Sequence, residues 1–301
     1  MPNHSAPANS DETRFGIFLV VVGLCIAALI GALMKILVED LHAVQITFVR
    51  FLGFALLLLP LVVKLKGPQA LYPARPKIQF LRGISLAAAT VTFVLGAAQI
   101  HYADAIAILY AYPFLLTIMA ALFLGEKVTT TGWIGVIGGF AGVLLVIRPS
   151  FSSINTGTLY VFASALIVSI QMTFNRQLGK SVDPLITSLW GALVASVLLV
   201  MVAWKYWLPL NVEQLAILSF IAVIGMISQL CIVYGFSKAE ASKIAPFTYI
   251  EIIAAVLYGM LFFGTLPGLL SWLGMILIAS SGILVAKTLK SPVAPRRNPK
   301  I

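Results

Sequence analysis

A single carboxylate interrupts an otherwise uncharged part of this sequence. Glu251 lies in the segment from Ile244 to Gly264, where no other residue carries a charge. Apolar surroundings disfavour the charged form of an acid, so such a group can hold and release a proton or accept a hydrogen bond from a polar solute. The structural alternative is a protonated Glu that is hydrogen-bonded to a neighbouring helix. An intramembrane acid is costly unless it is paired, protonated or in a water-filled cavity. We favour the functional role, in which Glu251 faces such a cavity.

Aromatic and amide side chains extend the candidate binding site. Helical spacing predicts that Phe247, Glu251 and Tyr258 share one face. The remaining candidates for binding a small solute lie in other apolar runs or next to Glu251: Gln99, Tyr110, Tyr112, Gln171, Asn175, Trp190, Gln229 and Tyr249. Rings and amides with one acid suit a planar neutral or cationic molecule, whereas packing inside the protein is the alternative for each residue.

A second group of residues is assigned structural or gating roles: Arg50, Pro113, Glu126 and Pro246. Arg50 lies inside an apolar run, with Glu39 and Asp40 in the preceding loop as candidate partners. The two prolines are expected to interrupt their helices and to free backbone carbonyls toward a cavity. Few cations are expected on that cavity, which disfavours multiply phosphorylated solutes.

The elements that must position these residues are membrane-spanning helices. The 301 residues are 60% hydrophobic and 10% charged, whereas soluble domains carry about 25% charged residues. Apolar runs of 18 residues or more indicate transmembrane helices. Ten runs qualify: 15–37, 44–63, 80–100, 105–124, 130–147, 157–177, 185–204, 214–236, 244–264 and 267–286. The sequence therefore predicts an all-α membrane protein with little chain left for a soluble domain.

The distribution of cations predicts the orientation. Of the 20 Lys and Arg residues, Lys35, Arg148 and Lys205 fall on the far side of the predicted spans and Arg50 lies within one. The other 16 fall on the side of the N-terminus, and they include Arg82 at the start of the third span. Because cations favour the cytoplasmic side, both termini are expected in the cytoplasm. The net charge of +10 then reflects topology and requires no nucleic-acid partner.

Internal similarity predicts two halves of five helices each. The segment "LFLGE" at 122–126 matches "LFFGT" at 261–265, and the same shift superposes Tyr110 on Tyr249 and Trp133 on Trp272. Because five is odd, the second half must enter the membrane from the opposite side, which is typical of secondary transporters. We expect an N-terminal cytoplasmic segment (1–14), two inverted-topology repeats (15–148 and 157–287) and a basic cytoplasmic tail (288–301).

These features resemble the drug/metabolite transporter superfamily of the EamA type. The resemblance rests on ten helices in 5+5 order, on "FVRFLGFALLL" around Arg50, on "LGEKVT" after the fourth span and on "ASKIAPFTYIEIIAAVLYGMLFFG" in the ninth. The second half has Gly264-Thr265 where the family usually has Gly-Glu. Within the family the chain is most similar to bacterial riboflavin-uptake proteins. The resemblance implies a multi-pass protein of the bacterial inner membrane.

The expected function is secondary active transport of a small organic metabolite by alternating access. Riboflavin uptake is the specific substrate expectation, and export of amino acids, drugs or other metabolites is the alternative. A membrane-embedded enzyme is the alternative of another class, although neither H-E-x-x-H nor G-x-S-x-G occurs. A complete ATP-binding loop is also missing, because Phe174 replaces its first glycine. The expected partners are the solute, membrane lipid and protons, with no metal or other cofactor, and the protein is expected to be a monomer or a homodimer.

The predicted orientation can be tested with reporter fusions along the chain. Fusions after Lys66, Lys127 and Lys180 should report the cytoplasm, and a fusion after Arg148 should report the periplasm, because of the cation asymmetry. A periplasmic report at Lys180 would contradict the arrangement of ten inverted-repeat helices.

Overall fold

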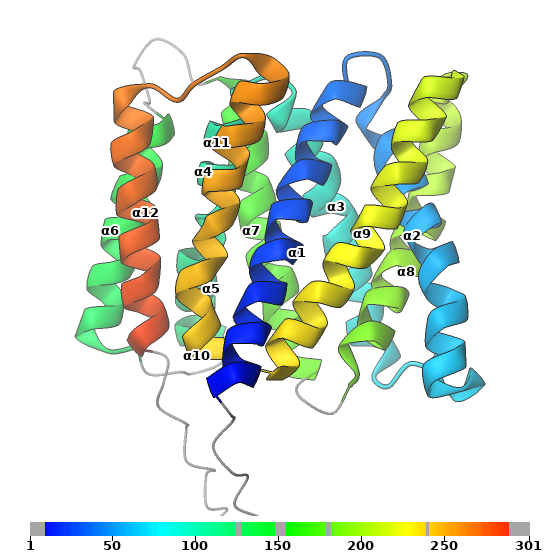
Figure 1. Ribbon diagram of the computed structural model, residues 1–301, viewed down its shortest axis with the longest axis horizontal. Coiled ribbons are helices and arrows are strands. Elements are labelled where there is room, and N and C mark those ends of the chain that lie inside the picture. Colours follow the sequence, from blue (N-terminus) through cyan, green and yellow to red (C-terminus); the bar gives the residue numbers. More distant parts are fainter. Residues whose placement is uncertain (1–9, 124–127, 148–154, 179–181, 239–240, 289–301) are drawn as a thin grey trace, which may run out of the picture.

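The described part of the chain is helical throughout and contains no strand. The computed structural model describes residues 10–123, 128–147, 155–178, 182–238 and 241–288 (Figure 1). The helices are α1 (Ser10–Leu37), α2 (Ala43–Lys66), η1 (Pro68–Leu71), α3 (Pro76–Ala97), α4 (Tyr102–Leu109), α5 (Tyr112–Phe123), α6 (Thr130–Ile147), α7 (Thr156–Leu178), α8 (Pro184–Lys205), α9 (Val212–Lys238), α10 (Ala241–Ile244), η3 (Ala245–Tyr249), α11 (Ile250–Phe263) and α12 (Leu269–Thr288).

Ten helical stretches within the described ranges are long and apolar enough to cross a membrane. This result confirms the ten predicted spans. The fourth span joins α4 to α5, and the ninth joins η3 to α11. The third span ends at Ala97, so Gln99, which was expected inside it, lies beyond its end.

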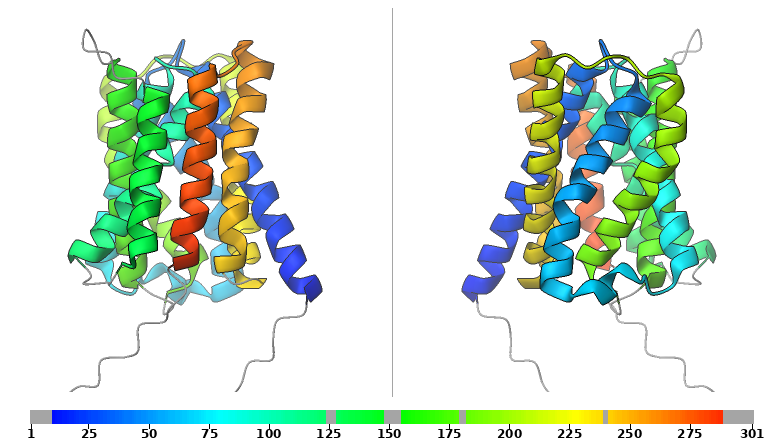
Figure 2. Two further views of the ribbon diagram at one scale, coloured as in Figure 1. Left: turned by 90° about the vertical axis from the view of Figure 1, so that its left-hand side faces the viewer. Right: turned by 90° about the vertical axis from the view of Figure 1, so that its right-hand side faces the viewer.

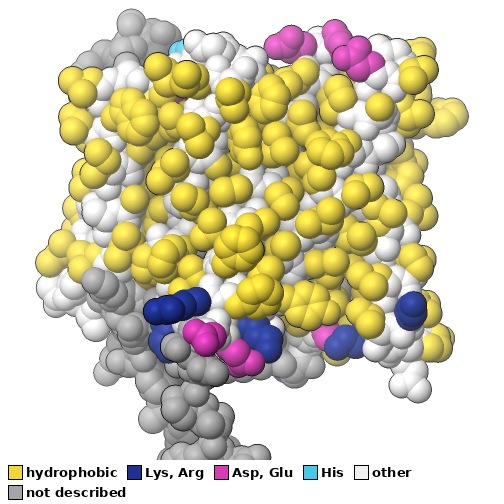
Figure 3. Space-filling view, in the orientation of Figure 1, with side chains coloured by type: hydrophobic (Ala, Val, Ile, Leu, Met, Phe, Trp, Pro, Cys, Tyr) yellow, Lys and Arg dark blue, Asp and Glu magenta, His cyan; other side chains and the backbone are white. Residues whose placement is uncertain are grey.

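The outer surface separates into an apolar belt and two polar faces. Figure 3 shows apolar side chains over most of the height of the bundle, with Lys and Arg gathered along its lower edge. Both the start of α1 and the end of α12 lie at this lower side (Figure 1). We call this side the terminal face and the opposite side the distal face. The apolar belt is the surface that lipid would cover.

The main helix contacts pair the two halves of the chain. α1 packs on α9, α2 on α8, α3 on α7 and α6 on α12. Two side views show the spans standing next to one another, with α1 leaning away from the bundle at the terminal face (Figure 2). In a 5+5 repeat the first span corresponds to the sixth, the second to the seventh, and so on. Under this correspondence the pair α1–α9 becomes the pair α7–α3, whereas α2–α8 and α6–α12 each correspond to themselves. Two copies of one five-helix unit require this pattern.

A close glycine contact also occurs twice, at opposite faces. A Cβ atom on Gly96, near the distal end of α3, would lie 2.6 Å from the carbonyl oxygen of Gly157 at the start of α7. A Cβ atom on Gly235, near the terminal end of α9, would lie 2.7 Å from the carbonyl oxygen of Gly16 in α1. Only residues without a side chain allow backbones to approach so closely. Corresponding contacts at opposite faces are what halves of opposite orientation would produce.

The fourth and ninth spans are broken near their prolines. α4 ends at Leu109 and α5 begins at Tyr112, with Pro113 in its first turn. In the ninth span, Pro246 lies in the 3₁₀ segment η3, which becomes α-helical at Ile250. The break of the fourth span lies in mid-span and that of the ninth at its start. Both leave backbone groups that need partners other than their own helix.

The crossing of α6 and α12 depends on a pair of glycines. Cβ atoms added to Gly142 and Gly274 would lie 2.8 Å and 2.6 Å from each other's carbonyl oxygens. We predict that Gly142→Ala forces these helices apart and destabilises the protein by about 1–3 kcal/mol, seen as a lower Tm of the purified protein in detergent.

Gly259→Ala is the matched control, because its nearest neighbour outside α11 would be 3.6 Å from the new Cβ. This variant should keep or raise the Tm, since Ala is the better helix former. Equal Tm values for the two variants would contradict the proposed role of the α6–α12 contact.

Candidate functional site

A cavity of about 680 Å³ lies between the two halves of the chain. Its wall is formed by α1, α2, α3, α7, α8 and α9 and by the breaks of the fourth and ninth spans. It extends from Ile30 and Ile221 to Val182 and Phe236, which lie close to the terminal face. Its volume is within the usual range for sites that hold small organic molecules.

The cavity is closed toward the distal face by packed apolar side chains. Met34, Leu37, Ile46 and Leu218 belong to one buried cluster that fills the bundle between α1, α2 and α9. Gln45, also buried, fastens the start of α2 to the loop after α8, because its amide exchanges two hydrogen bonds with the backbone of Leu208, of 2.7 and 3.0 Å. The arrangement is therefore closed on the distal side.

Six of the predicted residues line the cavity, and they come from both halves of the chain. They are Arg50, Tyr110, Tyr112, Gln171, Asn175 and Gln229. The amide of Gln229 donates a 2.7 Å hydrogen bond to the hydroxyl of Ser188, which is also on the wall. The wall thus combines phenol, amide and hydroxyl groups with apolar surface.

Other predicted residues lie away from the cavity wall. Tyr258 packs on Phe262, with 6.0 Å between ring centroids, and Tyr249 is buried behind Tyr110, with 5.3 Å between their ring centroids. Trp190 is partly buried, and its indole nitrogen has no hydrogen-bond partner among the described residues. Gln99 belongs to a separate hollow that includes Lys35 and His101.

Phe247 does not share a face with Glu251 as predicted. The 3₁₀ geometry of η3 causes the difference. Four α-helical steps would leave Phe247 about 40° from the direction of Glu251, but the two steps from Phe247 to Tyr249 are 3₁₀ and raise this angle to about 80°. Phe247 consequently points outward and is 45% exposed.

Glu251 reaches the cavity through Tyr110. The hydroxyl of Tyr110 lies 2.8 Å from Oε2 of Glu251 and 2.6 Å from the carbonyl oxygen of Thr248. A tyrosine hydroxyl has one hydrogen, and a carbonyl oxygen can only accept. Both contacts are full hydrogen bonds only if Tyr110 donates to Thr248 and a protonated Glu251 donates to Tyr110. The contacts therefore fit a protonated carboxyl group that is hydrogen-bonded to a neighbouring helix, which is the structural alternative given in the sequence analysis.

The same site can also hold the ionised form of Glu251. The residue lies in the first turn of α11, where the helix dipole favours negative charge. After losing its proton, the carboxylate would need the hydrogen of Tyr110, which would have to release Thr248. Since Tyr110 and Thr248 both line the cavity, the protonation of Glu251 is linked to the hydrogen bonds of the cavity wall.

Arg82 is a wall residue that the sequence analysis missed. It is 8% exposed, and it donates hydrogen bonds to Oδ1 of Asn175 (2.5 Å) and to the carbonyl oxygen of Thr187 (2.9 Å). Sequence reasoning grouped it with the cations outside the membrane. Its position seven residues into α3 was the available signal. With Arg50, it gives the cavity two arginines, which corrects the expectation of few cations there.

The expected partners of Arg50 do not reach it. Among the described residues no ion pair joins Arg50 to Glu39 or Asp40. Asp40 instead accepts a 3.3 Å hydrogen bond from Gln214. Glu126, the other charged residue assigned a structural or gating role, lies outside the described residues.

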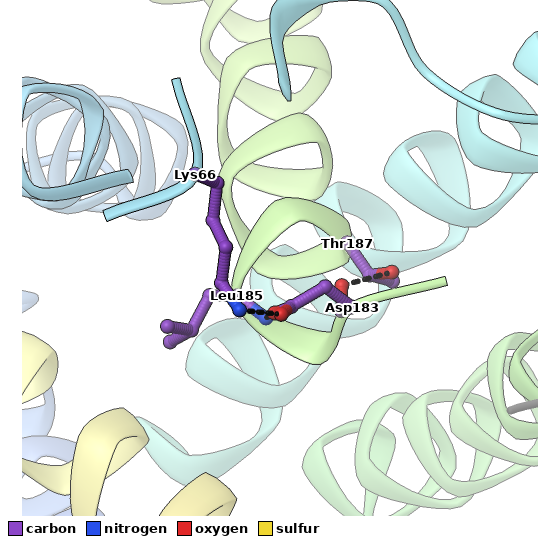
Figure 4. Close-up of polar contacts among 4 residues, drawn as sticks. All are labelled: Lys66, Asp183, Leu185 and Thr187. Atoms are coloured by element: carbon purple, nitrogen blue, oxygen red, sulfur yellow. Dashed lines mark hydrogen bonds and ion pairs between the residues drawn. The ribbon is translucent and has the colours of Figure 1, made fainter. Parts of the chain in front are cut away.

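An ion pair ties α2 to α8 where the cavity nears the terminal face. Nζ of Lys66 lies 2.6 Å from Oδ2 of Asp183, and the other carboxylate oxygen of Asp183 caps α8 by accepting from the backbone N–H of Leu185 (Figure 4). Burial alone would raise the pKa of Asp183, but these contacts outweigh it and hold the pKa below its usual range. Val182 and Pro184, on either side of Asp183, line the cavity.

Comparison with known proteins gives consistent results. The model of the EamA-like transporter family matches residues 14–148 and again 155–287. The "S-adenosylmethionine uptake transporter" of Rickettsia bellii (strain RML369-C) is 24% identical, over 87% of this chain and 90% of that protein. The "Pseudopaline exporter CntI" of Pseudomonas aeruginosa (strain UCBPP-PA14) is 25% identical, over 93% and 99%.

Two further matches extend the comparison. The "Riboflavin transporter" of Rhizobium johnstonii (strain DSM 114642 / LMG 32736 / 3841) is 26% identical, over 78% of each chain. A solved structure described only as "Crystal structure of protein" superposes with a TM-score of 0.63 at 17% identity, covering 94% of this chain and 100% of that one. At this identity the structure supports the fold alone.

The two roles of Asp183 can be separated by substitution. Asp183→Asn keeps a capping oxygen but loses the ion pair, so it should destabilise the protein by no more than about 1 kcal/mol, because the pair is partly exposed. Asp183→Ala loses the cap as well and should cost about 1 kcal/mol more. Tm measurements in detergent test this order.

The pH dependence of these Tm values is a second check. Because the folded-state pKa of Asp183 is lowered, the wild-type advantage over Asp183→Asn should be complete above the unfolded value of about 3.9. It should disappear as the pH falls through the lowered pKa. A difference that is independent of pH would show that the ion pair does not contribute.

Proposed function

The chain belongs to the EamA-like transporter family, and on this premise we propose that it is a secondary transporter that moves a small organic metabolite through the central cavity by alternating access. The relatives that it matches are named as transporters. Membership in a transporter family leaves no support for the alternative of a membrane-embedded enzyme. The cavity is built within one chain, so a monomer can be the transporting unit, and a homodimer is not required.

The observation that carries this proposal is the cavity whose wall includes the Tyr110–Glu251 contact. Such a cavity lies between the two halves, reaches toward the terminal face and is closed toward the distal face. Alternating access requires a second state in which the distal cluster opens and the terminal side closes. The hydrogen bonds of Gln45 to Leu208 lie where the distal side would open, and the ion pair of Lys66 with Asp183 lies where the terminal side would close.

The proposed orientation places the terminal face in the cytoplasm of a bacterium, with the protein in the inner membrane. The gathering of Lys and Arg at that face supports it (Figure 3). The halves 15–148 and 157–287 act as the two inverted repeats in this proposal. The exchange symmetry of the helix pairs supports this division.

Glu251 is the proposed coupling residue, with protons as the coupling ion. Its two forms require different hydrogen bonds of Tyr110, and both Tyr110 and Thr248 contact the cavity. Binding or loss of one proton therefore changes the surface that the solute meets. A gradient of protons could in this way bias which state binds the solute.

Riboflavin uptake is one candidate among several for the transported solute. A relative named as a riboflavin transporter supports this solute, and a relative named for S-adenosylmethionine uptake supports another solute with the same direction. A relative named as a pseudopaline exporter supports a third solute and the opposite direction. The sequence analysis expected a planar neutral or cationic solute and assumed few cations on the cavity wall. Arg50 and Arg82 on that wall weaken this assumption.

Glu251→Gln tests the proposed coupling. The amide of this variant can donate to Tyr110 as a protonated Glu does, so the protein should fold, insert and keep its Tm. It cannot ionise, so accumulation driven by a pH gradient should fall to background and its pH dependence should disappear. The measurement is uptake of a panel of radiolabelled metabolites, with riboflavin, S-adenosylmethionine and amino acids among them, into proteoliposomes.

Exchange of labelled for unlabelled solute at equal pH on both sides is the internal control, because it needs no net proton movement. It should persist in Glu251→Gln. Gradient-driven uptake at the wild-type level in this variant would eliminate Glu251 as the coupling residue. Absence of transport for every solute by the wild-type protein would contradict the proposed function itself.

A further inference from the structure

Two arginines line the cavity, and Arg50 has fewer hydrogen-bond partners than Arg82. Its guanidinium group has five N–H donors. Among the described residues, it donates only to Sδ of Met34, at 3.3 Å, and otherwise lies over the ring of Phe51, 5.3 Å from the centroid. Neither contact supplies a negative charge or an oxygen acceptor.

Two other cations of the spans, Arg82 and Lys35, are held differently. Arg82 donates to the oxygen atoms of Asn175 and Thr187, and Nζ of Lys35 donates to the carbonyl oxygens of Ala97 and Ile100. These contacts join helices to one another and have a structural role. Arg50 also joins two helices, through Met34, but it has no oxygen acceptor of this kind, so packing of the protein does not account for its charge.

The depth of Arg50 makes an unpaired charge costly. It is the eighth residue of α2, so it lies about 10 Å inside the distal end of that helix. Charged side chains at such depth pair with other groups or mark the path of a solute. A side chain that opens onto a cavity can obtain its partner from a molecule that enters the cavity.

We propose that Arg50 binds a carboxylate group of the transported solute. The planar fork of a guanidinium group matches the two oxygen atoms of a carboxylate and forms short, charge-assisted hydrogen bonds with them. The substrate class is then organic carboxylates, amino-acid-like molecules included, and the inference rests on the proposed transport function. Tyr112, Gln171 and Gln229 on the same wall provide ring and amide contacts for the rest of such a solute.

The wall offers no competing negative charge close to the cavity surface. None of its lining residues is an Asp or a Glu, within the part of the chain that the structure describes. Glu251 lies behind Tyr110 and is neutral in the geometry described above. The charge of the wall is therefore positive, which favours an anionic group over a neutral or cationic solute.

The test compares molecules that differ only in one anionic group. The purified full chain in detergent is titrated with S-adenosylmethionine and its decarboxylated form, and with L-phenylalanine and phenethylamine. FMN and riboflavin form a third pair, in which the anionic group is a phosphate. Wild-type protein should bind at least one carboxylate about 10- to 100-fold more tightly than its partner without the carboxylate, as expected for hydrogen bonds to charged groups.

Two variants of Arg50 identify the residue responsible. Arg50→Gln should abolish the preference for the carboxylate, and Arg50→Lys, which keeps the charge but loses the fork, should retain part of it. Arg75→Gln is the matched control for loss of one positive charge. Arg75 lies at the terminal face and donates to the carbonyl oxygen of Gln177, away from the wall, so this variant should keep the full preference.

Three binding results would overturn the inference. These are a preference unchanged in Arg50→Gln, no wild-type preference for either carboxylate, and a preference for FMN over riboflavin without a preference for the carboxylates. A lipid phosphate as the true partner would show itself as stabilisation by phosphatidylglycerol that Arg50→Gln abolishes, and would also overturn it. If the wild-type protein transports riboflavin while any of these results holds, the proposed function stands and only the inference about Arg50 fails.

Discussion

The cost of an unsatisfied polar group in a hydrocarbon layer determines the organisation of this protein. A straight transmembrane helix meets this constraint with its own backbone hydrogen bonds, but a broken one does not. The ninth span is broken at η3, and the carbonyl oxygen of Thr248 obtains its hydrogen bond from Tyr110 in the fourth span. The fourth span is itself broken directly after Tyr110. The break of the ninth span therefore depends on a side chain at the break of the fourth, and both breaks contribute to the cavity wall.

The same constraint gives Glu251 two states instead of one fixed role. The tyrosine hydroxyl that it contacts is shared with a backbone carbonyl, and one hydrogen cannot serve two acceptors fully. A proton on the carboxyl group supplies the missing hydrogen. Losing that proton leaves one acceptor poorly satisfied, and the structure must then change locally. In the coupling proposed above, this local change is how a difference in proton concentration would alter the cavity wall.

The sequence could predict what depends on composition and local spacing. The apolar runs predicted the ten spans, and the prolines predicted breaks in the fourth and ninth. Six of the candidate residues do line the cavity. The position of Phe247 could not be predicted, because helical spacing assumes an α-helix and the segment around Pro246 is a 3₁₀ turn.

Local sequence patterns also could not predict which side chains contact one another across the bundle. Arg82 lies near the end of its span, where a cation could equally turn outward to the water. Only the packing of α7 and α8 beside α3 provides Asn175 and Thr187 as acceptors and turns the side chain inward. Similarly, Asp40 is close to Arg50 in the sequence, but the packing of α1 and α2 against α9 brings it to Gln214 instead.

The paired glycine contacts give two helix pairs a pivot point each, at opposite faces of the bundle. α1 and α9 touch through Gly16 and Gly235 near the terminal face, and they diverge toward the distal face (Figure 1). α3 and α7 touch through Gly96 and Gly157 near the distal face. About 30 Å of helix extends beyond each glycine contact. A rotation of one helix by about 10° about this contact therefore moves its far end by about 5 Å. Such a rotation of one pair would open a passage at the distal face, and of the other at the terminal face. Each would keep its glycine contact but would stretch one further contact, the hydrogen bond of Ser228 to Gly23 or that of Ser164 to Ala89.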